Sequence, residues 1–186
     1  MSLYNERYST YQEFEEERIK TDKRLEFIDG IIYMSPSPSI KHQAISSYLH
    51  GELYNLLKGS KYNVFAAPTD VVLNNESEDE KKRVVPDLFV ACNPDNFTEN
   101  EYVGAPEFII EILNPSNKSH DMVTKLNLYM NFGVKEYWIV DPIENHIMVY
   151  YVDDDQEIQF SLIENGVFVV SKLFETFKIN TNELFS

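Results

Sequence analysis

The stretch RVVPDLFVACNPDNFTENEYVGAPEFIIEILNPS, from Arg83 to Ser116, holds two apolar runs, each with an acidic residue inside it. The first run, VVPDLFVA, contains Asp87, and the second, EFIIEIL, contains Glu111. Each run has the length and the apolar composition of a buried strand. An isolated carboxylate is costly in such a strand unless a positive group compensates it. The two runs therefore require a positive partner, either elsewhere in the chain or as a bound cation.

The two carboxylates themselves point to a cation site. Alternation along a strand places Asp87 on the face of Phe89, and Glu111 on the face of Leu113. If the two strands are neighbours, the carboxylates converge, and two hard oxygen ligands suit Mg²⁺. A bound Mg²⁺ activates water and stabilises a phosphate under attack. The alternative is that each acid lies at a strand end, capped or solvated, but two acids in consecutive strands favour the metal site.

Length and composition set the class of protein. The chain has 186 residues, and its 43% hydrophobic content predicts a globular chain, which we expect to form a single domain over residues 1–186. One cysteine, Cys92, excludes an internal disulfide and fits a small core residue. No apolar run approaches the roughly 20 residues of a membrane span, and the N-terminus lacks a secretory signal. We therefore expect a cytoplasmic protein with no membrane partner.

The charge of the chain argues against a nucleic-acid binder. There are 31 acidic and 16 basic side chains, for a formal net charge of −15, whereas such proteins usually show a basic surface. A local basic cleft or a metal ion can offset this acidity. The basic residues that could meet a phosphate backbone are Lys41, Lys81, Lys82, Arg83, Lys118 and Lys125.

Periodicity predicts a mixed α/β (α+β) fold, in which a mixed β-sheet is flanked by helices. Helical spacing covers 10–20, 39–58 and 119–132. Asp29-Gly30, between two short apolar runs, is a strong hairpin signal. The nearly continuous apolar run at 135–141 predicts a strand that is covered on both faces. Strands are also expected within 62–73, 84–91 and 107–113, and antiparallel strands within 146–170.

The order Pro-Asp, then an acid about two dozen residues later, resembles the PD-(D/E)XK nuclease pattern. In that pattern a lysine two residues after the acid orients or deprotonates the attacking water, but this chain has Leu113 there. The helix that follows offers a replacement, since Asp121, Lys125 and Tyr129 lie at i, i+4 and i+8 on one face. Lys125 would lie at the edge of an apolar stripe that packs on the sheet. The stripe consists of Met122, Val123, Leu126 and Met130.

The alternative for this helix is an exposed Asp121–Lys125 ion pair, worth only ~0.3–0.5 kcal/mol. Taken alone, the pair fits that surface role better than a role in a site. Trp138 fits a core residue better than a platform for stacking bases.

Several segments together resemble the Uma-two family of restriction endonucleases, a branch of the PD-(D/E)XK nuclease-like fold. The matching segments are RLEFIDGIIYMSPSPSIKHQ, VVPDLFV, GAPEFIIEILNPSNKSHDMVTKLNLYMNFGVKEYWIVDP and NELF, in the order that the family has them. They span the chain from about residue 12 to its end, which sets the expected core at about 12–186. The third segment is long and specific. The resemblance implies a restriction-endonuclease-like fold.

The resemblance also implies roles for individual residues. Asp87 and Glu111 correspond to the family's metal ligands, and Lys125 corresponds to a lysine that has migrated to the helix. Glu26 and His42 correspond to auxiliary site residues, although weighed alone they fit an ordinary strand acid and a helix-surface histidine. Asp121 and Tyr129 belong to the Asp-x-x-x-Lys and Tyr pattern of the same helix. The chain departs from the family at Asn114, where a serine is more usual.

Two functions follow from different classes of protein. The first is a Mg²⁺-dependent DNA endonuclease, with Mn²⁺ as a substitute, in which Asp87, Glu111 and the carbonyl of Ile112 hold the metal and Lys125 acts on the water. A homodimer is expected there, because cutting both strands of a duplex needs two sites. The second is a catalytically idle binding or assembly module. The net charge of −15 favours the second function, and the intact Asp-Glu-Lys set favours the first.

Overall fold

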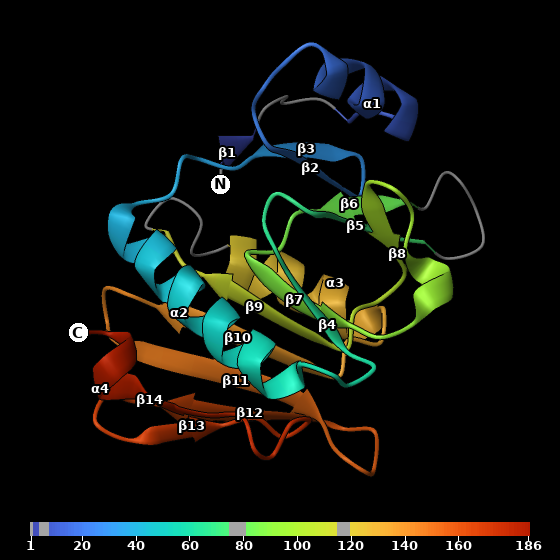
Figure 1. The fold of residues 1–186 in the computed structure, drawn as a ribbon. Helices are drawn as coiled ribbons and strands as arrows, with labels where there is room; N and C mark the ends of the chain where they lie inside the picture. Colours follow the sequence, from blue (N-terminus) through green and yellow to red (C-terminus); the bar gives the residue numbers. More distant parts are fainter. Residues whose placement is uncertain (1, 4–7, 75–80, 115–119) are drawn as a thin grey trace.

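The computed structural model describes residues 2–3, 8–74, 81–114 and 120–186. Its strands form two six-stranded sheets and one small two-stranded sheet, and helices lie against them (Figure 1). In each large sheet one pair of neighbouring strands is parallel and the others are antiparallel. The predicted mixed β-sheet architecture with flanking helices is therefore confirmed, with its strands divided between two large sheets.

The N-terminal sheet has the strand order β1-β3-β2-β6-β5-β8, and helix α1 (Tyr11–Ile19) packs beside β2. Its hairpin, β2 to β3, turns at Asp29 and Gly30, whose φ angles of 51° and 80° suit a two-residue type I′ turn. The hairpin predicted from Asp-Gly is therefore confirmed. The strands are β1 (Ser2–Leu3), β2 (Leu25–Ile28), β3 (Ile31–Met34), β5 (Asp70–Leu73), β6 (Lys82–Val84) and β8 (Glu101–Val103).

The central sheet has the strand order β12-β11-β10-β9-β7-β4. All six residues of β10 are buried, as its continuous apolar sequence predicts, and Trp138 lies in the core. The strands are β4 (Asn63–Ala66), β7 (Leu88–Ala91), β9 (Phe108–Ile112), β10 (Glu136–Asp141), β11 (His146–Val152) and β12 (Ile158–Ile163). The remaining elements are the 3-10 helix η2 (Pro94–Asn96), β13 (Phe168–Val170), β14 (Lys178–Asn180) and α4 (Thr181–Leu184).

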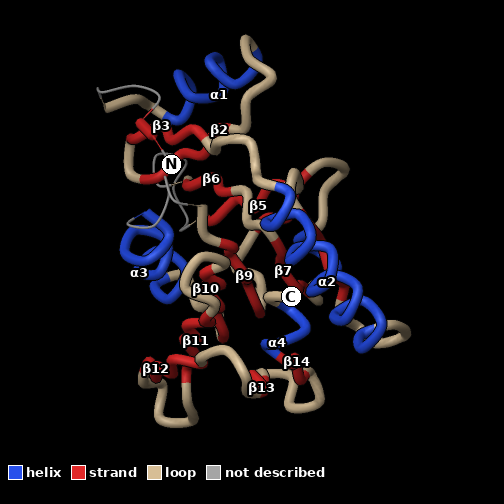
Figure 2. The backbone as a smooth tube through the Cα atoms, turned by 90° about the vertical axis from the view of Figure 1, so that its left-hand side faces the viewer, coloured by secondary structure: helices blue, strands red, loops and turns tan. Residues whose placement is uncertain are grey.

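Helix α2 (Ile40–Leu57) and helix α3 (Leu126–Asn131) cover opposite faces of the central sheet (Figure 2). The Ser39 side chain caps α2 by accepting a hydrogen bond from the His42 amide at 3.1 Å. The buried side chains of α2 are spaced three or four residues apart, which fits the helical prediction for 39–58. The tail strands β11 and β12 are antiparallel neighbours, as expected.

Asp87 does not lie within a strand, which corrects the expectation of a single apolar strand over 84–91. Strand β6 ends at Val84 in the N-terminal sheet and β7 begins at Leu88 in the central sheet. Pro86 lies between them and has no N–H to donate to a ladder, which favours a break there. Asp87 therefore belongs to the link between the two sheets.

The helix predicted for 119–132 also differs from a regular α-helix. Its first part, η3 (His120–Lys125), is a π-helix, and α3 continues from it. A π turn spans an extra residue per hydrogen bond, so the 3.6-residue spacing does not hold across it. The predicted stripe is therefore wrong at Val123, which is 58% exposed, while Lys125 is 2% exposed.

Candidate active site

Strand pairing brings Asp87 and Glu111 together. Strands β7 and β9 are antiparallel, with Leu88 opposite Ile110. One step further, the same register places Asp87 opposite Glu111, and residues opposite each other point to the same face. The Asp87 amide donates to Glu111 Oε2 at 3.3 Å. Asp87, just before the first residue of β7, therefore lies beside Glu111, near the end of β9.

The buried Glu111 carboxylate accepts hydrogen bonds on both oxygens. Its Oε1 accepts from Lys125 Nζ at 2.8 Å and from the Tyr129 hydroxyl at 2.9 Å. Both donors come from the η3–α3 segment, which packs on the face of the sheet toward which Glu111 points. Tyr129 is fully buried, so its hydroxyl holds the carboxylate without competition from water.

Asp87 is more open to solvent and takes its contacts from two other elements. Its Oδ2 accepts from the Ile112 amide at 2.9 Å and lies 3.0 Å from His42 Nε2. His42 lies in the first turn of α2 and is buried, so it is not the surface histidine that its sequence alone indicates. Both contacts fall on Oδ2.

Lys125 is buried between two carboxylates. Its Nζ lies 3.0 Å from Glu26 Oε1 as well as 2.8 Å from Glu111 Oε1. Glu26, in β2, is fully buried and also accepts from the Val85 amide at 2.7 Å. The alternative of an exposed lysine in a surface ion pair is therefore wrong. The side chain of Asp121 lies outside the described part of the chain.

His42, Asp87, Glu111 and Lys125 border a small pocket with a volume of about 20 Å³, which is the scale of one water molecule or ion. Its walls come from the end of β9, from α2 and η3, and from the segments next to β2, β3 and β6. Asn114, the position where the chain departs from the family pattern, also faces this pocket. The lining includes Arg24, His42, Val85, Asp87, Glu111 and Lys125.

The charges around the pocket do not balance. Asp87 and Glu111 line the pocket, and Glu26 lies beside it as the second partner of the buried Lys125. The cations near these three carboxylates are Lys125 and Arg24, so one negative charge is left over. Converging carboxylates repel one another unless a cation compensates them. Among the described residues, no three His, Cys, Asp or Glu side chains gather as a complete ligand set. Two carboxylates nevertheless match Mg²⁺, which usually keeps several waters and binds proteins through one or two carboxylates.

Most of the basic residues expected to face a phosphate are used in other ways. Arg83 is buried and bonds to Asp70 at 2.9 Å and Glu101 at 2.6 Å. Lys82 pairs with Asp29 at 3.0 Å.

Lys41 donates to the Pro142 carbonyl and to Asn145. Lys118 lies outside the described residues. Of the basic run Lys81 to Arg83, Lys82 and Arg83 thus have acidic partners that lie far from them in the sequence.

Sequence reasoning missed Arg24, which lines the pocket together with the acids. A signal was present: Arg24 lies two residues before Glu26, and such residues share a face of an extended chain. It also missed Glu136, a buried carboxylate that accepts from the Trp138 indole at 2.6 Å, the Ser171 hydroxyl at 2.7 Å and the Leu173 amide at 2.7 Å. Glu136 fixes the C-terminal segment to β10 and does not line the pocket that Asp87 and Glu111 border.

Comparison with known proteins shows the family of the chain. A family model described as "Uma2: Putative restriction endonuclease" matches residues 8–182. The chain belongs to this family. Among curated relatives of the chain, uncharacterized protein slr1290 of Synechocystis sp. (strain ATCC 27184 / PCC 6803 / Kazusa) is 27% identical over 131 residues. That alignment covers 70% of this chain and 67% of the relative.

A solved structure shares the fold of this chain. The crystal structure of a protein from Anabaena variabilis ATCC 29413, described as a putative nuclease belonging to DUF820, aligns with a TM-score of 0.71 and 23% identity. The alignment covers 91% of this chain and 96% of the other. Family and fold thus place the chain among nuclease-like proteins. No helix in the described ranges combines the length and the apolar character that a membrane crossing demands.

Proposed function

We propose that this chain is a metal-dependent endonuclease that hydrolyses phosphodiester bonds of DNA. One observation carries the proposal: Lys125, from the helix after β9, is buried and lies 2.8 Å from Glu111 at the pocket that Asp87 also borders. The PD-(D/E)XK pattern lacks its lysine at Leu113, and Lys125 brings an ammonium to the same carboxylate from a different element. Two acids and one lysine at a pocket are the set that the PD-(D/E)XK pattern uses for phosphodiester hydrolysis.

In this proposal the attacking water occupies the pocket between Asp87, Glu111 and Lys125. Two carboxylates within 3.0 Å favour the charged form of Lys125, so it orients the water as a hydrogen-bond donor. The water oxygen forms a bond to phosphorus while the bond from phosphorus to the leaving sugar oxygen breaks. The water's proton passes to solvent, and the leaving oxygen takes a proton from solvent. Glu26 and Tyr129 are positioning residues that hold Lys125 and Glu111.

The donor set fits Mg²⁺, with Mn²⁺ as a substitute. Asp87, Glu111 and the carbonyl of Ile112 would hold the ion, and the remaining positions suit water. When bound, the ion supplies positive charge that polarises the phosphoryl oxygen and promotes ionisation of water. His42 and the Ile112 amide both contact Oδ2 of Asp87, which fixes the orientation of that carboxylate. Two copies of the chain in a homodimer would present one such site to each strand of a duplex.

A second function, an idle binding or assembly module, is favoured by the net charge of −15. The proposed metal site is tested with Glu111→Gln. In the endonuclease it abolishes Mn²⁺ binding and leaves the fold intact or slightly stabilised, because Lys125 keeps Glu26 as its partner.

Calorimetric titration with Mn²⁺ tests this, with Glu144→Gln, in an exposed turn, as the control for losing one carboxylate. Unchanged Mn²⁺ affinity in Glu111→Gln would count against Glu111 as a ligand. Plasmid cleavage with Mg²⁺, absent in EDTA, separates the two functions: Mn²⁺ binding without cleavage of any DNA supports the idle module.

A further inference from the structure

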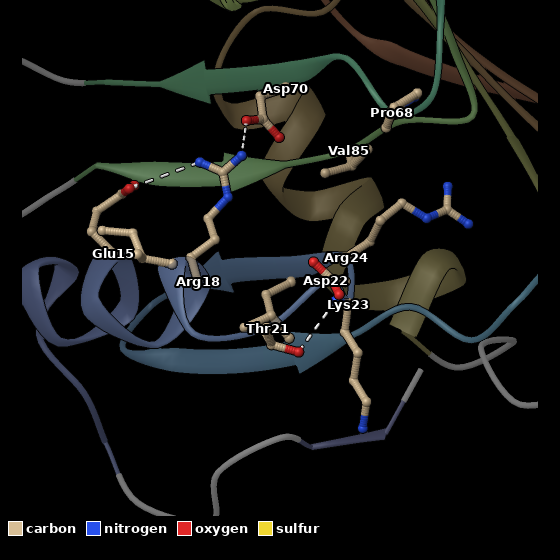
Figure 3. A pocket seen from close by; sticks show the side chains of 11 residues that line it. Glu15, Arg18, Thr21, Asp22, Lys23, Arg24, Pro68, Asp70 and Val85 are labelled. Carbon is tan, nitrogen blue, oxygen red and sulfur yellow. Dashed lines mark hydrogen bonds and ion pairs between the residues drawn. The ribbon is translucent and has the colours of Figure 1, made fainter.

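A second cavity adjoins the acidic pocket and shares two of its lining residues, Arg24 and Val85. It is much larger, about 300 Å³, and lies beside α1, the segment before β2, and the link from β4 to β5 (Figure 3). That volume is at the lower end of pockets that hold small ligands. Arg24 therefore lines both the larger cavity and the pocket that Asp87 and Glu111 border.

The charged groups of this cavity fall into two sets. In the first set, Arg18 already has acidic partners within the protein, because it pairs with Asp70 and lies 3.8 Å from Glu15 (Figure 3). Arg83, behind them, also bonds to Asp70. The acids of this first set are therefore compensated within the protein.

Arg24 belongs to the second set. Within the described residues its guanidinium makes no hydrogen bond or ion pair, and it points away from the Arg18–Asp70 pair in Figure 3. Its main chain is fixed, since its carbonyl accepts from the Ser35 amide at 3.0 Å. An anchored backbone with an uncommitted guanidinium is the arrangement of a ligand-binding arginine. The neighbouring Lys23 and Asp22 are exposed.

We propose that Arg24 binds a phosphate of the nucleic-acid backbone and that the larger cavity holds the nucleotide next to the cleaved bond. This rests on the proposed function. Arginine binds phosphate through two parallel N–H donors, which a point charge cannot reproduce. A chain of net charge −15 needs such a local cation where DNA approaches its carboxylates. Arg24 and Glu26 share a face, so the arginine meets the substrate beside the carboxylate that holds Lys125.

The test measures binding separately from cleavage. Fluorescence anisotropy with a labelled short duplex in EDTA gives the affinity at several salt concentrations. Arg24→Met should weaken binding about tenfold or more and reduce the salt slope by about 1, the loss of one phosphate contact. Arg24→Gln serves as a second variant, and both should melt as the wild type does. Asp22→Asn should strengthen binding, because it removes a carboxylate from the same cavity.

Lys58→Met is the matched control, since it also removes one positive charge but lies at the far end of α2 from His42. It should leave affinity and salt slope close to those of the wild type. The inference is overturned if Arg24→Met and Arg24→Gln bind like the control, or if the wild type binds no duplex. Failure of the proposed function gives a different result. The wild type would then neither cleave DNA nor bind Mn²⁺, while its DNA binding would still depend on Arg24.

Discussion

Two clusters of buried charge lie in this chain, and they differ in how their charges are compensated. Around Arg83, Asp70 is buried, whereas the side chains of Glu15 and Glu101 are 34% and 27% exposed. Around Lys125, the side chains of both carboxylate partners are at most 4% exposed. Water therefore solvates part of the negative charge around Arg83, whereas the carboxylates around Lys125 are shielded from water.

The difference separates a structural cluster from a site. Asp70 receives two arginines, Arg18 and Arg83, so its charge is compensated by the chain itself even though burial raises its pKa. Around the pocket, the three carboxylates of Glu26, Asp87 and Glu111 have two cations, Lys125 and Arg24, near them, and one negative charge is left over. Negative charge left over beside a pocket calls for a cation from outside. The cluster around Arg83 has its remaining negative charge on Glu15 and Glu101, which are in contact with solvent, so it holds the fold together without an added ion.

The largest expected effect tests the structural cluster. Arg83→Met should lower the free energy of unfolding by about 3–5 kcal/mol, because it leaves Asp70 buried with only Arg18 as a partner. Urea unfolding with and without Mg²⁺ measures this, and the ion should restore none of the loss. A matched loss of charge at the exposed Lys58 should change stability by less than about 0.5 kcal/mol. If Mg²⁺ restored the stability of the Arg83 variant, the Arg83 cluster would also respond to a metal ion, and the two clusters would not differ in this respect.

The next effect tests the site. Lys125→Met should slow DNA cleavage roughly 10²-fold or more, about 2.7 kcal/mol, while Mn²⁺ still binds. The variant should lose stability in EDTA, since Glu26 and Glu111 lose their shared cation, and regain part of it with Mg²⁺. Rates are compared at a temperature where melting curves show the variant folded. Wild-type cleavage rates on every DNA tested would mean that the lysine serves only the fold.

The sequence was sufficient to predict those parts of the structure that depend on short, local segments. Asp29-Gly30 specifies its turn through positive φ angles, and the 135–141 run predicts a buried strand from composition alone. The facing of Asp87 and Glu111 also follows from alternation once β7 and β9 are neighbours. These features depend on short segments or on one pairing.

Long-range partners could not be predicted. Arg83 follows Lys81 and Lys82 and resembles a solvated basic run, but its partners Asp70 and Glu101 lie 13 and 18 residues away in sequence. Lys125 is buried because a π-helix shifts the spacing before it, which no periodicity reveals. The roles of Glu26 and His42 stay predictions that came from family resemblance. Their contacts join β2 and α2 to distant segments.

The smallest expected effect comes from moving the lysine from the helix to strand position 113. It tests whether the charge of Lys125 serves the reaction or only the fold. Leu113 follows Glu111 by two positions and shares its face, packed in the cluster that holds Tyr129. In the Lys125→Met background, Leu113→Lys should restore part of the lost cleavage rate, because its ammonium would approach Glu111 from the strand instead of the helix. The rescue should be incomplete, since Leu113 is buried and a lysine there loses apolar contacts and costs stability.

Leu113→Met in the same background controls for the change of shape without adding a charge. The double variant must still melt cooperatively, and its cleavage rate should rise at least severalfold above that of Lys125→Met. If Leu113→Lys and Leu113→Met give equal rates in folded proteins, an ammonium beside Glu111 is not what the reaction lacks. The excess negative charge at the pocket would then serve metal binding alone. Lys125, like Arg83, would have a purely structural role.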